Sequence, residues 1–408
     1  MNDFLLVLSS SIAGSFTGAL TGLIPGLHTN NVAILLLALI PSGIYSVYIC
    51  IFIVAAAISH TFLDIIPSTF IGAPEEDTAL VVLPAHSMVL QGRGYEAICI
   101  SASSSLTSVV FCLALLLPFR FLIGSPINLY ELIEQNIPWI LICISLIVIF
   151  TNDSIWKAFA IFLLSGFFGI VALTFETSFL FQSSPIFPAL AGLFGAPALL
   201  YSKHKILPKQ NLVEKIDIEE REVSNGVVAG SMVSILPGVS SAVAATLAIA
   251  VKKKRKEEEA ISLLSATNTA NNFFVLAMLF IMLKARSGFA VVIKKYIEVE
   301  QWNSLLFPYP YNLFLIAVII SSTISYFLTK YIGRIIAMNI SKISYSSIIR
   351  IAFGIIVVMI FLFTGFLGLL IFGIASLIGI ICLEMKVRRS VCMGFLLLPL
   401  ILNHINFL

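Results

Sequence analysis

Charged residues are scarce in this 408-residue chain, and their scarcity excludes a water-soluble protein. Asp, Glu, Lys and Arg make up 11% of the residues against 59% hydrophobic residues, and the mean hydropathy is +1.05. Such a composition cannot cover a surface that faces water, so the sequence predicts a multi-pass protein of the cell membrane. The net charge is only +3 and no nucleic-acid motif is present, so we expect no nucleic-acid partner.

Motifs for catalysis or metal binding are missing as well. The six cysteines lie in apolar runs without a Cys-x-x-Cys pair, and the histidines have no metal-ligand spacing. Gly-x-Gly-Asp, His-Glu-x-x-His and Gly-x-Ser-x-Gly patterns are absent, which argues against an intramembrane protease. We therefore expect a protein that is not an enzyme and holds no metal or organic cofactor.

A broken hydrophobic segment occurs twice in the chain, with the two copies 212 positions apart. Each copy has a Gly-x-x-x-Gly pair followed by Pro-Gly: Gly14, Gly18, Pro25 and Gly26, then Gly226, Gly230, Pro237 and Gly238. Hydrophobic helices that are interrupted at matching places in two halves indicate a transporter binding site. A single tilted span that is kinked at the proline is the alternative for each copy.

The charged loops around the second copy predict its topology. Broken at Pro237, the apolar stretch 224–251 gives two pieces of 13 residues, each about 20 Å long, which reach the membrane midplane and turn back. Both flanks are basic, so the positive-inside rule places the loops 203–222 and 252–259 in the cytoplasm. The apolar and charged residues of 289–302 predict an amphipathic segment on the outer surface.

Counting spans from these loops predicts the whole architecture. Four candidate spans follow each hairpin: 95–119, 137–151, 156–176 and 183–201, then 309–329, 347–365, 366–384 and 391–406. The first quartet begins and ends inside, and the second begins and ends outside. We predict an all-α polytopic membrane protein of two inverted-topology repeats, each with broken or re-entrant helical hairpins followed by about four transmembrane helices. The first repeat covers 1–202, a cytoplasmic charged linker covers 203–223, and the second repeat covers 224–408.

Longer motifs surround these breaks. The first half carries Gly-Ala-Leu-Thr-Gly-Leu-Ile-Pro-Gly-Leu-His-Thr-Asn-Asn (18–31) and Ile-Gly-Ala-Pro-Glu-Glu-Asp-Thr-Ala-Leu (71–80), and the second carries Ala-Thr-Asn-Thr-Ala-Asn-Asn (266–272). In order and spacing they resemble the large membrane subunit of the tripartite tricarboxylate transporters, in the branch found in archaea. The resemblance implies an inverted-repeat carrier of an organic anion that is coupled to H⁺ or Na⁺.

The chain also departs from this family. Thr267-Asn268 stands where the family usually has Pro-Glu, and no segment resembles the small membrane subunit or the periplasmic binding protein. The resemblance therefore does not fix a tricarboxylate as substrate, and it does not require either partner.

Polar residues that follow the breaks are candidate substrate ligands, because free backbone N–H groups at a helix start attract anions. The candidates are Pro25, Gly26, Thr29, Asn30, Asn31, Gly72, Pro74, Pro237, Gly238, Ser240, Ser241, Asn268, Asn271 and Asn272. Helix capping is the alternative for each Thr, Asn or Ser. Asn268 and Asn272 share a helix face, so their amides could bind one substrate or bond across a helix interface.

Acidic residues inside apolar stretches are candidates for binding the coupling ion, since ionisable groups at membrane depth are costly. They are Glu75, Glu76, Asp77 and Asp64. Glu75 is favoured by its resemblance to the family's Pro-Gly-Glu block. A solvated turn is the alternative for the three adjacent acids, and an interfacial position is the alternative for Asp64.

The sequence thus predicts a secondary active transporter that binds a small organic anion at broken helices near the membrane midplane. A translocase for polyprenyl phosphate is the main alternative, because similar repeat hairpins occur in such families and helix starts bind phosphate as readily as carboxylate. A passive channel is a further alternative. Membrane lipid is an expected partner, and a homodimer stays open.

Overall fold

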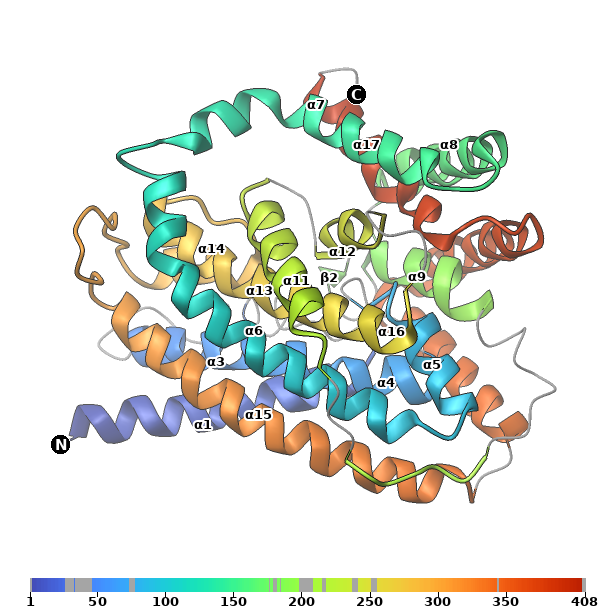
Figure 1. Cartoon of the computed structure of the whole chain (residues 1–408), viewed down its shortest axis with the longest axis horizontal. Helices are drawn as coiled ribbons and strands as arrows, with labels where there is room; N and C mark the ends of the chain where they lie inside the picture. The colour runs from blue at the N-terminus through green and yellow to red at the C-terminus, as the bar shows by residue number, and fades with distance from the viewer. Residues whose placement is uncertain are drawn as a thin grey trace.

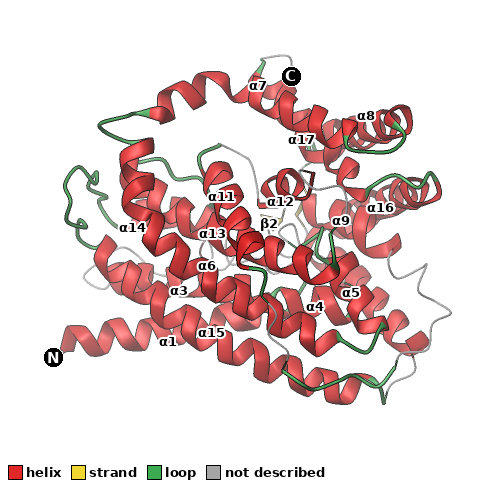
Figure 2. Cartoon of the chain, viewed as in Figure 1, coloured by secondary structure: helices red, strands yellow, loops and turns green. Residues whose placement is uncertain are grey.

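The computed structural model describes residues 2–25, 33, 46–72, 78–175, 177–178, 182–183, 185–197, 208–214, 218–236, 241–250, 255–342 and 345–405. This part of the chain is helical apart from loops and one antiparallel pair of two-residue strands (Figures 1 and 2). The elements of the first half are α1 (Asn2–Leu23), α3 (Ser46–Leu63), α4 (Ile65–Phe70), α5 (Val82–Leu90), α6 (Gly94–Ile123), α7 (Leu129–Phe150), α8 (Ile155–Ala172), β1 (Thr177–Ser178), β2 (Gln182–Ser183), α9 (Ile186–Leu190) and the π-helical turn η1 (Ala191–Gly195). Those of the second half are α11 (Glu220–Ser234), α12 (Ser241–Ala250), α13 (Glu257–Ile281), α14 (Gly288–Tyr296), α15 (Tyr311–Ile340), α16 (Tyr345–Glu384), the 3₁₀ turn η2 (Arg389–Met393) and α17 (Gly394–His404).

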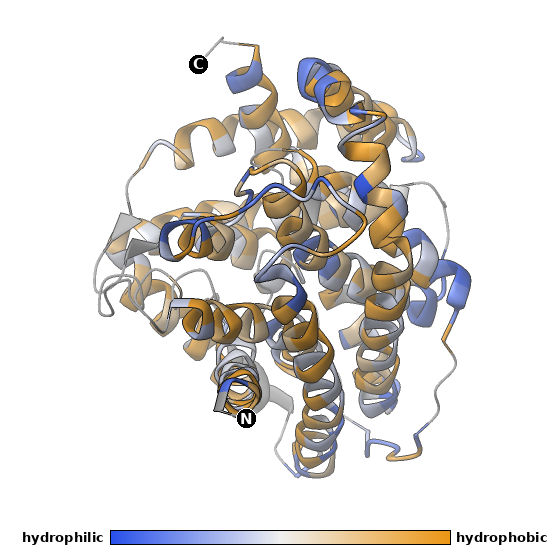
Figure 3. Ribbon diagram, turned by 90° about the vertical axis from the view of Figure 1, so that its left-hand side faces the viewer, coloured by the Kyte–Doolittle hydropathy of each residue, from blue (hydrophilic) through white to orange (hydrophobic). Residues whose placement is uncertain are grey.

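Eight helices within the described residues are long and apolar enough to cross a membrane. Figure 3 shows apolar residues along most of the helix surfaces, and most hydrophilic residues lie in loops and at helix ends. Large apolar side chains also point outward, for example Trp156, which is 82% exposed. The prediction of an all-α polytopic membrane protein is therefore confirmed.

The helix α16 is a hairpin of two helices that meet at Gly365. Gly365 has a φ of 66°, a left-handed conformation that a glycine adopts without strain. The rings of Phe353 and Phe372 lie 5.7 Å apart, whereas 19 residues of straight helix would span about 28 Å. The chain therefore folds back at Gly365, as the predicted adjacent spans 347–365 and 366–384 require.

Two predicted spans are shorter than expected. In the run 183–201 the helix starts after Pro185, and the described part is helical from 186 to 197, as α9, η1 and the two residues after η1. The run 391–406 forms η2 and α17, which end at His404. A full crossing needs about 20 residues, so the described helical part of each run is shorter than a full-length transmembrane helix. Three long helices precede each short segment: α6, α7 and α8 in the first half, and α15 and the two helices of α16 in the second.

The amphipathic segment predicted at 289–302 forms α14 and the loop after it. Phe289, Val292, Ile293 and Trp302 are buried against the protein, and α14 packs on α3. The apolar face is thus covered by the chain itself and not by the lipid surface that the sequence suggested.

In each half, the helix that carries the Gly-x-x-x-Gly pair packs parallel to a later helix of the same half: α1 packs along α3, and α11 packs along α13. In the first half the backbones meet at three levels in the same order: Gly14 with Phe52, Gly18 with Ala56, and Gly22 with His60. In the second half Gly226 of α11 meets Leu263 of α13, and Gly230 meets Thr267. A Cβ atom at Gly230 would lie 2.7 Å from the carbonyl oxygen of Thr267, so only glycine permits this approach.

Two long helices pack along a helix of the opposite half: α6 packs along α13, and α15 packs along α3. Ser325 and Thr329 of α15 bond in turn to Ser59 and Phe62 of α3, so these two helices are parallel. The helix α6 runs parallel to α13: Ser101 bonds to Ser265, and Phe119 contacts Phe274.

The buried apolar residues form two large clusters. One contains most of α1, α3 to α6 and α13 to α15, and the other contains α7, α8, α9, η1, the second helix of α16, η2 and α17. In Figure 1, α8 and α17 accordingly lie far from α1 and α15. Each short segment packs on a long helix of the opposite half: η1 packs on α16, and α17 packs on α8.

Candidate functional site

A carboxylate and an amide meet where α3 and α13 approach each other. Asp64 joins α3 to α4 and is 1% exposed, and Asn268 lies near the middle of α13 and is 3% exposed. The amide nitrogen of Asn268 donates to Oδ2 of Asp64 at 2.7 Å. Thr61 and Thr269 form a second bridge between the same helices, with their hydroxyl oxygens 3.2 Å apart. These contacts join two of the sequence-predicted residues, which are 204 positions apart.

The chemistry of this contact leaves amide oxygens without a donor. An ionised carboxylate can only accept hydrogen bonds, so the NH₂ group of Asn268 must face Asp64. Oδ1 of Asn268 is buried and has no partner among the described residues, and the same holds for Oδ1 of Asn271. Residues 268 and 271 share a helix face. The arrangement therefore offers a carboxylate and unpaired amide oxygens within one buried region.

The end of α1 borders the same region. A Cβ atom at Gly22 would lie 3.0 Å from the backbone nitrogen of Asp64, so the last turn of α1 lies against this residue. Thr21 bonds to Nδ1 of His60 at 3.0 Å. The chain therefore leaves α1 directly beside Asp64 and continues toward the first Pro-Gly break.

Both predicted breaks occur in the structure. The helix α1 ends at Leu23, two residues before Pro25, which is buried. The helix α11 ends at Ser234, three residues before Pro237, and α12 begins at Ser241. Neither α1 nor α11 therefore continues as an unbroken helix into its proline, and the path of the chain at 26–32 and at 237–240 lies outside the described residues.

Many predicted site residues cannot be placed around this centre. Gly72 follows α4, is buried and has a φ of 68°, so it ends this helix in a turn. The following residues lie outside the described residues: Gly26, Thr29, Asn30, Asn31, Pro74, Glu75, Glu76, Asp77, Pro237, Gly238 and Ser240. Ser241 is described only as the first residue of α12. Asn272 donates to the backbone oxygen of Asn268 at 3.4 Å, so its amide bonds within its own helix.

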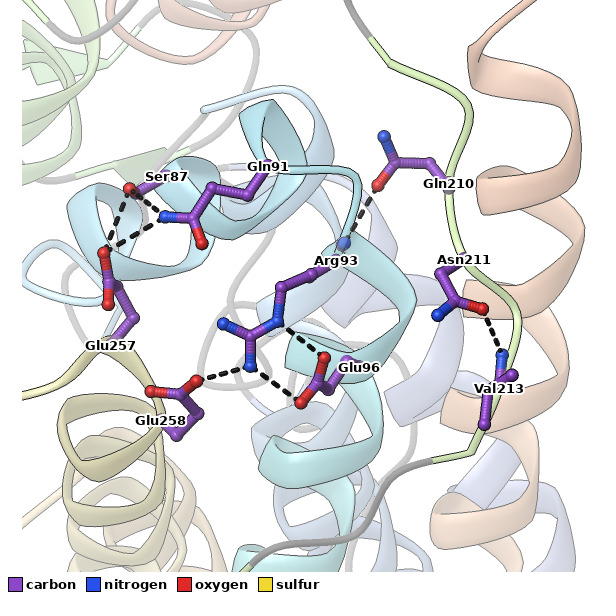
Figure 4. A network of polar contacts seen from close by, with 10 residues as sticks. Ser87, Gln91, Arg93, Glu96, Gln210, Asn211, Val213, Glu257 and Glu258 are labelled. Carbon is purple, nitrogen blue, oxygen red and sulfur yellow. Dashed lines mark hydrogen bonds and ion pairs between the residues drawn. The ribbon is translucent and has the colours of Figure 1, made fainter.

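A polar network ties the two halves together at one end of the helices (Figure 4). The guanidinium of Arg93 binds both oxygens of Glu96, with each distance 2.8 Å, and it also contacts Glu258 at the start of α13. Oε1 of Glu257 accepts from Ser87 and Gln91 of α5. Arg93 is thus held in ion pairs with two carboxylates, one from each half of the chain.

The segment 208–214 extends this network to α15. The carbonyl oxygen of the Gln210 side chain accepts from the backbone nitrogen of Gly94 at 2.9 Å (Figure 4). Glu214 accepts from Tyr95 at 3.1 Å and from Lys330 at 2.6 Å. The hydrogen bond from Lys330 lowers the pKa of the Glu214 carboxyl below its usual value of 4.5.

This lowered pKa predicts how the ion pair responds to pH. Because the pKa is lower in the folded state, the stabilisation is present above about pH 4.5 and is lost as the pH falls through the folded-state pKa. Glu214→Gln is expected to lower the midpoint of thermal unfolding slightly at pH 7 and to make no difference near pH 3. The loss is on the order of 0.5 kcal/mol, because Glu214 is partly exposed and water screens the pair. An equal effect at both pH values would contradict this assignment.

Some features of the centre were not predicted from the sequence. A ladder of hydroxyl groups joins α6 to α13: Ser101 bonds to Ser265 at 2.8 Å, and Ser108 donates to the carbonyl of Ala266 at 3.0 Å. The spacing of Ser101, Ser105 and Ser108 on one helix face was the available signal. Among the described residues, no group of three or more His, Cys, Asp or Glu could hold a metal ion.

Comparison with known proteins identifies the family of this fold. The model of the tripartite tricarboxylate transporter TctA family matches residues 8–394. An uncharacterized protein of Methanocaldococcus jannaschii is 30% identical over 404 residues, which cover 97% of this chain and 98% of that protein. This relative is archaeal, in agreement with the branch that the motifs resemble. No solved structure matches the chain. The chain is a multi-pass membrane protein that belongs to the tripartite tricarboxylate transporter TctA family.

Proposed function

We propose that the protein is a secondary active transporter for a small organic anion, coupled to H⁺ or Na⁺, with its binding centre between α3 and α13. The observation that carries the proposal is the buried contact between Asp64 and Asn268, with unpaired amide oxygens beside it. Family membership supports a transport function. A buried, ionisable residue between two membrane helices is a functional candidate by default.

We also propose that the two halves are inverted repeats related by a pseudo-two-fold axis in the membrane plane. The pairs α1 with α3 and α11 with α13 are both parallel, and they are built around matching glycines. Toward its C-terminal end α3 meets α13 in the opposite sense: Thr61 pairs with Thr269, while Asp64, three residues later, pairs with Asn268. Antiparallel pairing of equivalent helices is what an inverted repeat requires.

Asp64 is the residue we assign to the coupling ion. Na⁺ is a hard cation that prefers oxygen ligands, and a carboxylate with two amide oxygens supplies them. A proton would use the same carboxylate by neutralising it. Cation binding also explains why Oδ1 of Asn268 and Oδ1 of Asn271 are left without donors. Glu75, Glu76 and Asp77 stay alternative candidates.

The substrate anion needs hydrogen-bond donors, which this oxygen-rich centre lacks. We propose that the backbone N–H groups and side chains after the two Pro-Gly breaks supply them, with Thr29, Asn30 and Ser240 as the foremost side chains. The end of α1 lies beside Asp64, so the first break begins next to the proposed ion site. Such proximity lets bound cation and bound anion stabilise each other.

For the orientation, we propose that the network around Arg93 faces the cytoplasm. Arg93 contacts Glu258 at the start of α13, so the loop before α6 lies beside residues that follow the basic run 252–256, for which the positive-inside rule predicts a cytoplasmic position. Dependence on a periplasmic binding protein or a small membrane subunit is left open.

Uptake into proteoliposomes that contain the full purified chain tests this proposal. Radiolabelled mono-, di- and tricarboxylates are offered with an inward Na⁺ gradient, with an inward H⁺ gradient, or with neither. We expect at least one carboxylate to accumulate only when one gradient is present. Failure of every carboxylate under every gradient would overturn the proposal, and transbilayer movement of polyprenyl phosphate in the same vesicles would instead establish the lipid-phosphate alternative.

A further inference from the structure

A basic cavity lies where the two hydrophobic clusters meet, apart from the centre at Asp64. Its volume is about 420 Å³. One wall comes from α5 and from residues 255–260 around the start of α13, and another comes from residues 388–390, which lead into η2. The cavity thus joins elements of the first cluster to the short segment that ends the second one.

The charges that line the cavity are mostly positive. Arg255, Lys256, Arg388 and Arg389 line it, with Glu257 as the one acidic residue among the lining residues. Arg255 is already neutralised, because its Nε lies 3.2 Å from Oε2 of Glu222 and both side chains are buried. Among the described lining residues, basic side chains therefore outnumber acidic ones even though Arg255 is paired.

Arg389 is the residue that this cavity leaves incompletely paired. It is 6% exposed, and its Nη1 donates to the backbone oxygen of Phe194 at 2.7 Å. Its Nε has no partner among the described residues. Burial lowers the pKa of this guanidinium to about 10. A buried cation with one neutral acceptor is costly, and a bound oxoanion would remove that cost.

We propose that this cavity binds a phosphate group through Arg389, with Lys256 as a second cationic contact. A phosphate carries about two negative charges on a single centre at neutral pH, so it is attracted to a lining in which basic residues predominate. The guanidinium supplies a charged N–H donor to such a group, and the lysine adds a point charge. The phosphate can belong to a lipid headgroup or to a soluble molecule. Once bound, it links the start of α13 to η2 and so bridges the two clusters.

Thermal unfolding of the full chain, purified in detergent, tests this site with inorganic phosphate as the probe. Phosphate is expected to raise the unfolding midpoint by mass action at constant ionic strength. Arg389→Gln is expected to weaken phosphate binding by about tenfold or more, the effect of losing a charged hydrogen-bond donor. Arg350→Gln is the matched control, because Arg350 is exposed on α16 and does not line the cavity.

A second variant and a second membrane environment separate the outcomes. Lys256 is exposed, so Lys256→Gln is expected to fold even if Arg389→Gln does not, and to weaken phosphate binding several-fold. In lipid nanodiscs, stabilisation by phosphatidic acid without any effect of inorganic phosphate would assign the cavity to a lipid headgroup. No stabilisation by either source, an undiminished effect in both variants, or a stronger Arg389-dependent effect of citrate would overturn the proposal. None of these readouts involves transport.

Discussion

Accumulation of substrate against its gradient is expected to fall roughly a hundredfold or more when Asp64 is replaced by asparagine. Removing one charged partner from a buried site typically costs about 3–5 kcal/mol, and each 1.4 kcal/mol is a factor of ten. Asparagine has nearly the shape of aspartate, so packing against α13 is retained. The substitution thus removes the titratable charge and leaves the surroundings in place.

Exchange of labelled for unlabelled substrate then identifies the ion. Asparagine resembles a protonated carboxyl group, so exchange persists in the Asp64→Asn variant if the coupling ion is H⁺. If it is Na⁺, exchange falls together with net accumulation, because the cation site is lost. The matched control is Asp153→Asn, at an exposed residue in the loop between α7 and α8, and it should leave both activities unchanged. Full accumulation by the Asp64→Asn variant would place coupling elsewhere, with Glu75, Glu76 and Asp77 next to be tested.

Much of this fold could be predicted because the membrane imposes simple rules on sequence. Backbone groups in lipid must be paired internally, so long apolar runs had to be helices. Breaks were marked by a Pro-Gly pair, as in the stretches that follow α1 and α11, or by a glycine that permits a sharp reversal, as at Gly365. Hydrophobicity alone did not give the form of the helix at 183–201, where Pro185 precedes α9 and a π-helical turn follows it.

The site could be predicted in its parts but not in its pairing. Asp64 and Asn268 were each marked by a polar group in an apolar segment, yet their contact depends on how α3 crosses α13. Likewise, Arg255 lies in a loop that was predicted to be cytoplasmic, and only the fold shows that it lines one cavity together with Arg389. Pairings of this kind join residues more than 100 positions apart, and no local pattern in a single sequence encodes them.

Adding one methyl group to Gly18 is expected to destabilise the protein, whereas the same change at Gly373 is expected to stabilise it. A Cβ atom at Gly18 would overlap the backbone of Ala56 and lie 2.8 Å from Cβ of Ser59, so α1 and α3 must separate. Forcing an extra carbon into a packed interface costs about 1–3 kcal/mol. At Gly373, nothing lies within 4 Å of the added atom, and alanine restricts the unfolded chain by about 0.4–1 kcal/mol relative to glycine.

Gly230→Ala extends this comparison from stability to the binding centre. Its Cβ atom would lie 2.8 Å from the backbone nitrogen of Asn271, so the helix that carries both unpaired amide oxygens would have to move. We therefore expect Gly230→Ala to lower both the unfolding midpoint and the affinity for the coupling ion, whereas Gly18→Ala mainly lowers the midpoint. The measurements are thermal unfolding of the three purified variants and the ion concentration that gives half-maximal uptake. If all three alanine variants unfolded at the same temperature as the wild type, close backbone contact would not be what holds these helix pairs together.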